Sequence, residues 1–230
     1  LLCFWCAALW ALSHALQTDR LSYWLLVGVC SGLGLMSKYS MAILLPSAAL
    51  LLLWVPEYRY LFRRPGPYLG VLVAALIFLP NVLWNAANDF VSLKHTAEIS
   101  QLDRSSLNIA GLLEFVAAQL ICLGPWFVWL LRPSAYRNTS QFVVGYKFAI
   151  ALSVTFFAVI ALQALVSRAN ANWAAPGFVG VVMLLGVAMA RVARVETNFI
   201  GLGLNLLLIL ILQFYHPLLA VFDVAATSKN

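Results

Sequence analysis

Charged residues are scarce in this sequence: Asp, Glu, Lys and Arg together make up 10% of its 230 residues. A soluble domain needs about a quarter of charged residues to cover its water-facing surface. The chain is instead 63% hydrophobic, with a mean hydropathy of +0.93, which indicates an integral membrane protein. Its apolar residues form continuous runs and do not alternate with polar ones. This pattern predicts an all-α, polytopic helical membrane protein and argues against an outer-membrane barrel.

Cysteine is also rare, with four residues that all lie in apolar runs. Cys3 and Cys6 have the CxxC spacing of redox and zinc sites, but no second ligand pair and no polar surroundings accompany them. The three histidines are isolated from one another in the sequence. We therefore predict no metal site, and we interpret Cys3, Cys6, Cys30 and Cys122 as buried small hydrophobic residues.

About eight hydrophobic segments follow one another along the chain, joined by polar turns. The segments are 1–16, 21–36, 40–55, 68–84, 111–131, 143–166, 174–190 and 199–214. The chain begins at Leu1 inside an apolar run, without a methionine or a basic leader. We interpret residues 1–230 as a partial transmembrane domain that is truncated at its N-terminus, and we expect truncation at the C-terminus too. We predict no structure for the tail, 215–230.

The placement of basic residues predicts which connections face the cytoplasm. The three loops that hold most of the Lys and Arg residues are 56–67, 132–147 and 191–198. The positive-inside rule places these loops in the cytoplasm. Alternation of the segments then puts Lys38, the interval 85–110 and the turn 167–173 together on the opposite face. Because the net charge of +6 is spread over several loops, it does not indicate a nucleic-acid partner.

The longest polar interval is Trp84–Arg104, WNAANDFVSLKHTAEISQLDR, which we interpret as a loop and a candidate functional surface. Taken alone, such a loop is more often a solvated connection, so the interpretation depends on polar residues elsewhere on the same face. Polar residues inside the apolar segments lie toward the same face. These residues are Asn81, Glu114, Gln119 and Gln163, with Asn205 nearer mid-segment as the exception. Polar groups at this depth are costly unless they face a cavity or each other, so the pattern predicts a wet cavity that opens outward. The alternative is that each residue caps a helix end or reaches the interface separately.

Three kinds of side chain on this face have chemistry that suits a lipid-borne ligand. The cations and potential cations, natural ligands of a lipid phosphate, are Lys38, Lys94, His95, Arg104 and Arg168. The carboxylates, which could accept a proton from a hydroxyl, are Asp89, Glu98, Asp103 and Glu114. The aromatic residues, suited to stacking on a sugar or to an interfacial belt, are Tyr39, Trp84, Phe90 and Trp173.

Three sequence motifs carry a family resemblance. They are GLGLMSKYSM at Gly32–Met41, FLPNVLWNAANDFVSLKH at Phe78–His95 and RANANWAAPGF at Arg168–Phe178. In this order and spacing they resemble the bacterial family 39 glycosyltransferases. These polytopic enzymes are related to protein O-mannosyltransferases, lipid A aminoarabinose transferases and lipopolysaccharide-core galacturonosyltransferases. The resemblance extends over most of the chain, from about Leu1 to Asp223.

The resemblance implies the GT-C architecture and a sugar transfer with inversion. The implied donor is a polyprenyl-phosphate-linked sugar, and the implied acceptor is a hydroxyl of lipid A, a polysaccharide or a protein. The expected place is the periplasmic face of the bacterial inner membrane. Substrate-binding residues implied by the matching motifs are Lys38, Tyr39, Asp89, Lys94, His95, Arg168, Asn170, Asn172 and Trp173. Lys38 and His95 would hold the departing phosphate as its charge develops.

The same resemblance leaves the catalytic residue unknown. The family's catalytic Asp or Glu lies in the first external loop, which corresponds to sequence upstream of Leu1. We therefore expect this chain alone to be inactive, and the sequence leaves open whether a divalent metal assists. A transporter or flippase for a lipid or anionic solute is the main alternative, although no internal repeat typical of transporters is evident. A structural subunit, the third reading, predicts no converging cavity.

Overall fold

The structure is a computed structural model that describes residues 1–100, 107–132, 143–192 and 195–227. The chain forms two compact units, Leu1–Phe115 with Ser140–Met183 and Val116–Thr139 with Leu184–Asn230. Every regular element within the described residues is an α-helix or a 3-10 helix. The all-α fold predicted from the sequence is therefore confirmed.

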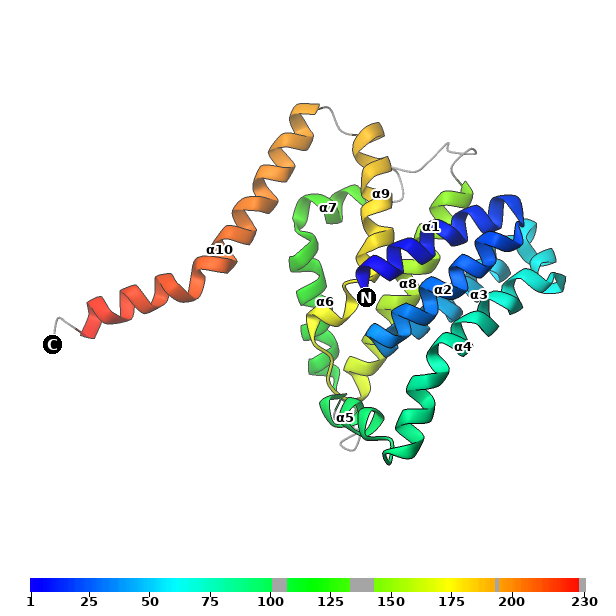
Figure 1. The fold of residues 1–230 in the computed structure, drawn as a ribbon. Helices are drawn as coiled ribbons and strands as arrows, with labels where there is room; N and C mark the ends of the chain where they lie inside the picture. Colours follow the sequence, from blue (N-terminus) through cyan, green and yellow to red (C-terminus); the bar gives the residue numbers. More distant parts are fainter. Residues whose placement is uncertain (101–106, 133–142, 193–194, 228–230) are drawn as a thin grey trace. The chain divides into compact units, whose positions relative to one another are not determined.

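Three long helices lie side by side in the first unit: α1 (Leu2–Thr18), α2 (Leu21–Ser37) and α4 (Pro65–Ala87) (Figure 1). Glycines let α2 and α4 approach closely, because a Cβ added at Gly28 would lie 2.4 Å from the Gly70 carbonyl oxygen. Such small-residue contacts replace the hydrophobic driving force that is absent between helices in lipid.

Between α2 and α4 the chain folds through three short elements: η1 (Tyr39–Ile43), α3 (Leu44–Trp54) and η2 (Pro56–Arg63). The pair Tyr39–Trp54 and Pro56–Arg63 bends by 119°, at Val55 just before Pro56. Proline cannot donate the backbone hydrogen bond that would continue α3, so the helix ends there.

The core of the first unit forms where these helices meet α8 (Val143–Val166). Trp5 of α1 and Phe156 of α8 are both fully buried and contact edge to face, with ring centroids 5.1 Å apart. By contrast, large apolar side chains are widely exposed on the outer faces of the helices. A surface this apolar is suited to the hydrocarbon of a bilayer and not to water.

Two described helices are long and apolar enough to cross a membrane, Pro65–Ala87 and Gly145–Val166, and the bent pair would make a third. Shorter apolar helices are Leu21–Ser37, Ile109–Leu123, Gly177–Ala190 and Val195–Ile211. The structure therefore supports a polytopic helical membrane protein. It does not establish eight separate crossings.

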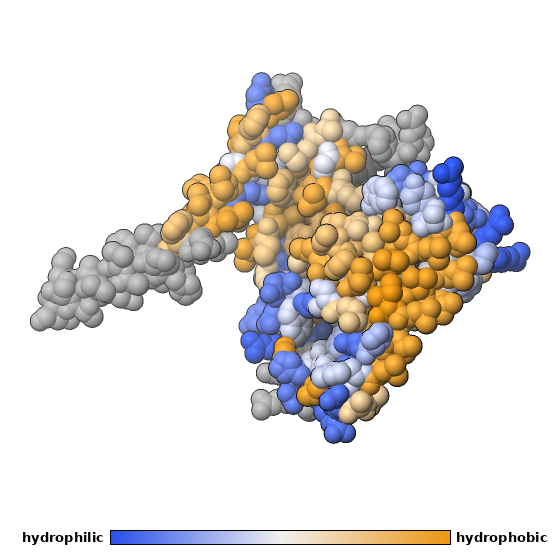
Figure 2. Space-filling view, viewed as in Figure 1, coloured by the Kyte–Doolittle hydropathy of each residue, from blue (hydrophilic) through white to orange (hydrophobic). Residues whose placement is uncertain are grey.

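A polar end lies on each side of an apolar band in the first unit. Figure 2 shows hydrophilic residues near the α1–α2 turn and again around α5 (Val91–Ser100), with a hydrophobic surface between them. Helix α2 joins the two ends, because Arg20 precedes it and Lys38 follows it. Its 17 residues give a length of about 25 Å, which separates Arg20 from Lys38 by much of a bilayer core.

The second unit includes α7 (Pro125–Leu130), α10 (Val195–Thr227) and parts of α6 (Ile109–Leu123) and α9 (Gly177–Val192). The predicted single segment 111–131 is wrong as one helix, because the helix breaks at Gly124, where φ is 79°. Glycine adopts this conformation without a steric penalty, and Pro125 then begins a new helix. The tail, for which we predicted no structure, continues α10 as far as Thr227.

Candidate functional site

A cavity of about 650 Å³ lies in the first unit, at the end of α2 that carries Lys38. Five parts of the chain line it: the α2–η1 junction, α4, α5, α8 and η6 (Ala171–Ala174). Its polar and aromatic lining residues are Ser37, Lys38, Tyr39, Ser40, Asn81, Ser92, His95, Thr96, Gln163 and Trp173. The three stretches that the sequence placed on one face thus each contribute to one cavity, through Lys38, His95 and Trp173.

Lys38 lies in the cavity wall because α2 ends just before it. Its backbone is extended, with φ −161° and ψ 132°, and its N–H donates to the Gly34 carbonyl 2.9 Å away. The helix break places the side chain at the end of the bundle and not in mid-membrane, where a lone ammonium costs several kcal/mol. Its ammonium makes no ion pair with any residue that the structure describes. A cation that pairs with no described carboxylate is available to an anionic ligand.

The interval after α4 contains a helix, so our prediction of a loop there is wrong. Helix α5 presents Ser92, His95, Thr96 and Ile99 to the cavity. These positions are three, four and seven residues apart, the spacing of one helix face. His95 has only a loose ionic neighbour, because its Nδ1 lies 3.9 Å from Glu98 Oε2 and both side chains are 71% exposed.

A chain of amide hydrogen bonds joins η1, α4 and α5 beside the cavity. The Tyr39 hydroxyl donates to Asn81 Oδ1 at 3.2 Å, and Asn85 Nδ2 donates to the same oxygen at 3.2 Å. Asn85 Oδ1 in turn accepts the backbone N–H of Ser92 at 3.2 Å. Asn85 is 2% exposed, so this network replaces hydrogen bonds to water and holds the start of α5 against α4.

Trp173 enters the cavity from the turn that follows α8. Asn108 holds this turn, because its Nδ2 donates to the Ser167 carbonyl at 3.0 Å and its Oδ1 accepts the Gly111 N–H at 2.8 Å. Asn108 therefore caps α6 and fixes the end of α8 at once. Trp173 is partly buried against the apolar core and also lines the cavity.

Five of the nine predicted substrate-binding residues do not line this cavity. They are all exposed: Asp89, Lys94, Arg168, Asn170 and Asn172. Asp89 has a structural reason for its identity, because its φ of 52° is left-handed and Asp tolerates that conformation well. Asn170 and Asn172 accept turn-forming backbone bonds from Trp173 and Ala175 through their main-chain oxygens.

The other polar predictions divide in the same way. Asn81 and Gln163 line the cavity, whereas Glu98 and Glu114 are exposed elsewhere. Asn205, the mid-segment exception, belongs to the second unit, where its Nδ2 donates to the Leu123 carbonyl at 3.0 Å, at the break before Gly124. Asp103 and Arg104 lie outside the described residues.

Some of the aromatic residues and cysteines lie where the sequence predicted, and others do not. Tyr39 and Trp173 line the cavity, while Trp84 and Phe90 are 52% and 45% exposed. All four cysteines are free, and Cys30 alone among them is buried. The prediction that Cys3, Cys6 and Cys122 are buried is wrong, because their helices turn these faces outward. An apolar thiol is tolerated there, since the surface of the bundle is itself apolar.

Sequence reasoning missed Ser40, Ser92, Thr96 and Asn85. The spacing of Ser92, His95 and Thr96 would have revealed the first turns of α5 if a helix had been considered there. Ser40 Oγ is buried and has no hydrogen-bond partner among the described residues, although it lines the cavity. A buried hydroxyl in this state is expected to bond to water or a ligand.

The cavity is lined by hydrogen-bond donors and not by carboxylates. An ammonium, an imidazole, hydroxyls and amides line it, and no Asp or Glu belongs to its described lining. In the part of the chain that the structure describes, no three His, Cys, Asp or Glu side chains are grouped to hold a metal ion. This donor set suits an anionic or hydroxyl-rich group, with the Trp173 ring as an apolar face for a sugar or hydrocarbon.

The fold and the cavity together define a polytopic membrane protein with a polar, donor-rich pocket at one end of its helices. Residues 1–84 match the family described as dolichyl-phosphate-mannose-protein mannosyltransferase. The chain is also 31% identical over 224 residues to lipid A galacturonosyltransferase RgtD of Rhizobium johnstonii (strain DSM 114642 / LMG 32736 / 3841). The chain is therefore similar in sequence to glycosyltransferases of these two kinds, in agreement with the resemblance that its motifs carry.

This relationship covers 95% of the chain but 47% of the curated relative. The chain thus spans about half the length of the relative that it matches. No solved structure matches the chain.

Proposed function

We propose that the protein to which this chain belongs is a glycosyltransferase. It transfers a sugar from a polyprenyl-phosphate-linked donor to a cell-envelope hydroxyl, such as one on lipid A, a polysaccharide or a protein. The chain contributes the part of the transmembrane domain that holds the donor phosphate, and the cavity faces the periplasm from the bacterial inner membrane. The observation that carries this proposal is the meeting of Lys38, His95 and Trp173 in one cavity.

The chemistry of the cavity supports the donor class. A lipid-linked phosphate has its charge at the membrane surface and its tail in the bilayer. The cavity matches this layout, because its ammonium and amides lie at the end of helices whose outer surfaces are apolar. As the bond to the sugar breaks, the leaving phosphate gains charge, and Lys38 with His95 would stabilise it. The Trp173 ring would then face the sugar.

The test is sugar transfer by membranes that contain the full-length protein with Lys38→Met. We expect transfer to fall roughly ten- to a hundredfold, the value of a hydrogen bond to a charged group. Lys147→Met is the matched control, because Lys147 lies near the start of α8, 5.9 Å from the Trp54 ring, and does not line the cavity. Normal transfer by Lys38→Met would contradict the proposal. If the wild type transferred no sugar and Lys38→Met lost lipid translocation, the flippase alternative would be favoured.

A further inference from the structure

The orientation of the Asn81 amide is fixed by a chain of donors that begins at a backbone N–H. The Ser92 N–H can only donate, so the atom it meets in Asn85 must be the carbonyl oxygen. Asn85 therefore turns its NH₂ group toward Asn81, and this group can likewise only donate. It meets Asn81 twice: at the backbone carbonyl oxygen, 3.0 Å away, and at the end of the side chain, 3.2 Å away, where a second NH₂ group would face it donor to donor and the atom is therefore the acceptor Oδ1. Two asparagine orientations are thus set by one main-chain group.

The consequence is an unused donor in the cavity wall. Asn81 Oδ1 accepts from Asn85 and from the Tyr39 hydroxyl, while Asn81 Nδ2 has no partner among the residues that the structure describes. Asn81 lines the cavity together with Lys38, Ser40 and His95. A side chain that cannot turn over presents its N–H groups in a fixed direction, and this pre-organisation lowers the entropy lost on binding.

We infer that Asn81 is a ligand-binding residue, whose amide N–H donates to a phosphate oxygen held beside Lys38, and that Asn85 and Tyr39 keep it oriented. Two features favour an anionic oxygen over a hydroxyl: the neighbouring ammonium and the absence of carboxylates from the described lining. The inference rests on the proposed function, because it assigns a residue to the phosphate of the same lipid-linked donor.

The sharpest variant is Asn81→Asp. It keeps the shape of the side chain and the oxygen that accepts from Tyr39 and Asn85, but it replaces the donor with a second acceptor. Asn81→Leu removes the donor without adding charge. The matched control is Asn88→Asp, because Asn88 ends the same helix, donates to the Trp84 carbonyl at 2.8 Å and does not line the cavity.

The measurement is binding of a short polyprenyl monophosphate to the full-length protein in nanodiscs, with the polyprenol of the same length as the uncharged probe. We expect Asn81→Asp and Asn81→Leu to bind the phosphate roughly tenfold or more weakly. Asn88→Asp should bind it like the wild type, and polyprenol binding should be the same in all four proteins.

Three outcomes would overturn the inference. Wild-type affinity in Asn81→Leu would mean that the amide donates nothing to the phosphate. An equal loss of polyprenol and polyprenyl phosphate binding would mean that Asn81 acts only in folding. Failure of the wild-type protein to bind the phosphate at all would remove the proposed function and this inference with it, and so is distinguishable from the first two results.

Discussion

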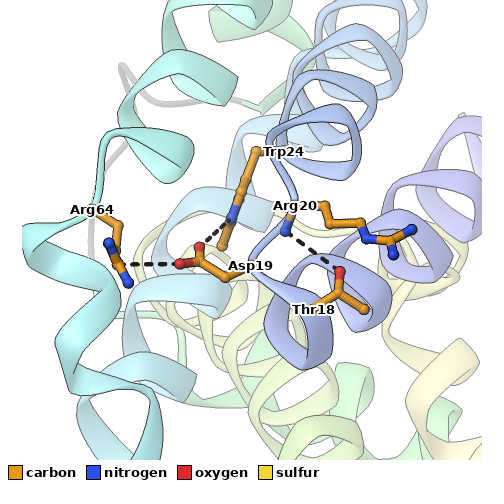
Figure 3. Close-up of polar contacts among 5 residues, drawn as sticks. All are labelled: Thr18, Asp19, Arg20, Trp24 and Arg64. Atoms are coloured by element: carbon orange, nitrogen blue, oxygen red, sulfur yellow. Dashed lines mark hydrogen bonds and ion pairs between the residues drawn. The ribbon is translucent and has the colours of Figure 1, made fainter.

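The Asp19 carboxylate ties three segments together at the end of α2 away from the cavity. Its Oδ2 lies 3.2 Å from Nε of Arg64, and its Oδ1 accepts the Trp24 indole N–H at 3.3 Å (Figure 3). Asp19 also ends α1 in the left-handed conformation, with φ 50°. One side chain therefore pairs the α1–α2 turn with the start of α4 and suits the backbone that it occupies.

Two substitutions separate these roles. Asp19→Asn keeps an acceptor for Trp24 and tolerates the left-handed backbone, so it loses only a partly exposed ion pair, worth about 1 kcal/mol or less. Asp19→Ala also loses the indole bond and adds backbone strain, for a total of about 2–4 kcal/mol. Thermal unfolding of the purified protein should show a clearly lower midpoint for Asp19→Ala than for Asp19→Asn. Equal midpoints would show that the ion pair alone matters.

The sequence shows which residue types the motifs contain, but it does not show which of their side chains face the cavity. Lys38 and His95 were predicted as ligands and line the cavity, whereas Lys94, adjacent to His95, does not. Neighbouring positions on a helix point about 100° apart, so Lys94 and His95 cannot both face the cavity once α5 forms. Which side chains of this segment line the cavity therefore depends on its being a helix, and residue composition does not give that information.

The close packing of α2 on α4 depends on two glycines of α2. A Cβ at Gly28 would meet the Gly70 carbonyl oxygen at 2.4 Å, and one at Gly32 would meet the Ile77 side chain at 2.7 Å. Backbone atoms cannot move aside as a side chain can. Gly28 and Gly32 are four residues apart, so they lie on one face of α2 and both meet α4.

Gly28→Ala should therefore destabilise the protein, by about 1–3 kcal/mol, through overpacking. Gly145→Ala is the control, because no atom lies within 4 Å of a Cβ built there. A helical glycine with open space around it should gain slightly from the change. The midpoint of thermal unfolding should fall for Gly28→Ala and stay level or rise for Gly145→Ala. A fall of equal size in both would contradict the close approach of α2 and α4.

At the scale of the whole molecule, composition predicted an all-helical membrane protein and charge bias predicted which connections share a face. The structure confirms the first inference, and Lys38, His95 and Trp173 from the three predicted stretches line one cavity, while the side of the membrane that this cavity faces stays a prediction. Both inferences depend on averages over many residues, so errors in single elements affect them little. The break at Gly124 and the helix α5 were missed because each depends on local geometry. A positive φ and a short capped helix leave little trace in hydropathy.

The arrangement of the first unit gives the proposed function its physical basis. An apolar band separates the end with the α1–α2 turn from the end with α5 (Figure 2). Asp19 pairs with Arg64 at the first end, and α5 lines the cavity at the second. A lipid-linked substrate could therefore keep its tail in the bilayer while its phosphate meets Lys38 and Asn81. Accessibility from one side of the membrane is the property that this account requires.

Sided labelling of single cysteines tests that requirement most directly. In a full-length protein freed of its native cysteines, Lys38→Cys, His95→Cys and Arg63→Cys would each be treated with a membrane-impermeant maleimide applied from the periplasmic side. We predict labelling at positions 38 and 95 and no labelling at position 63. Labelling of positions 38 and 95 from opposite sides of the membrane would contradict the account.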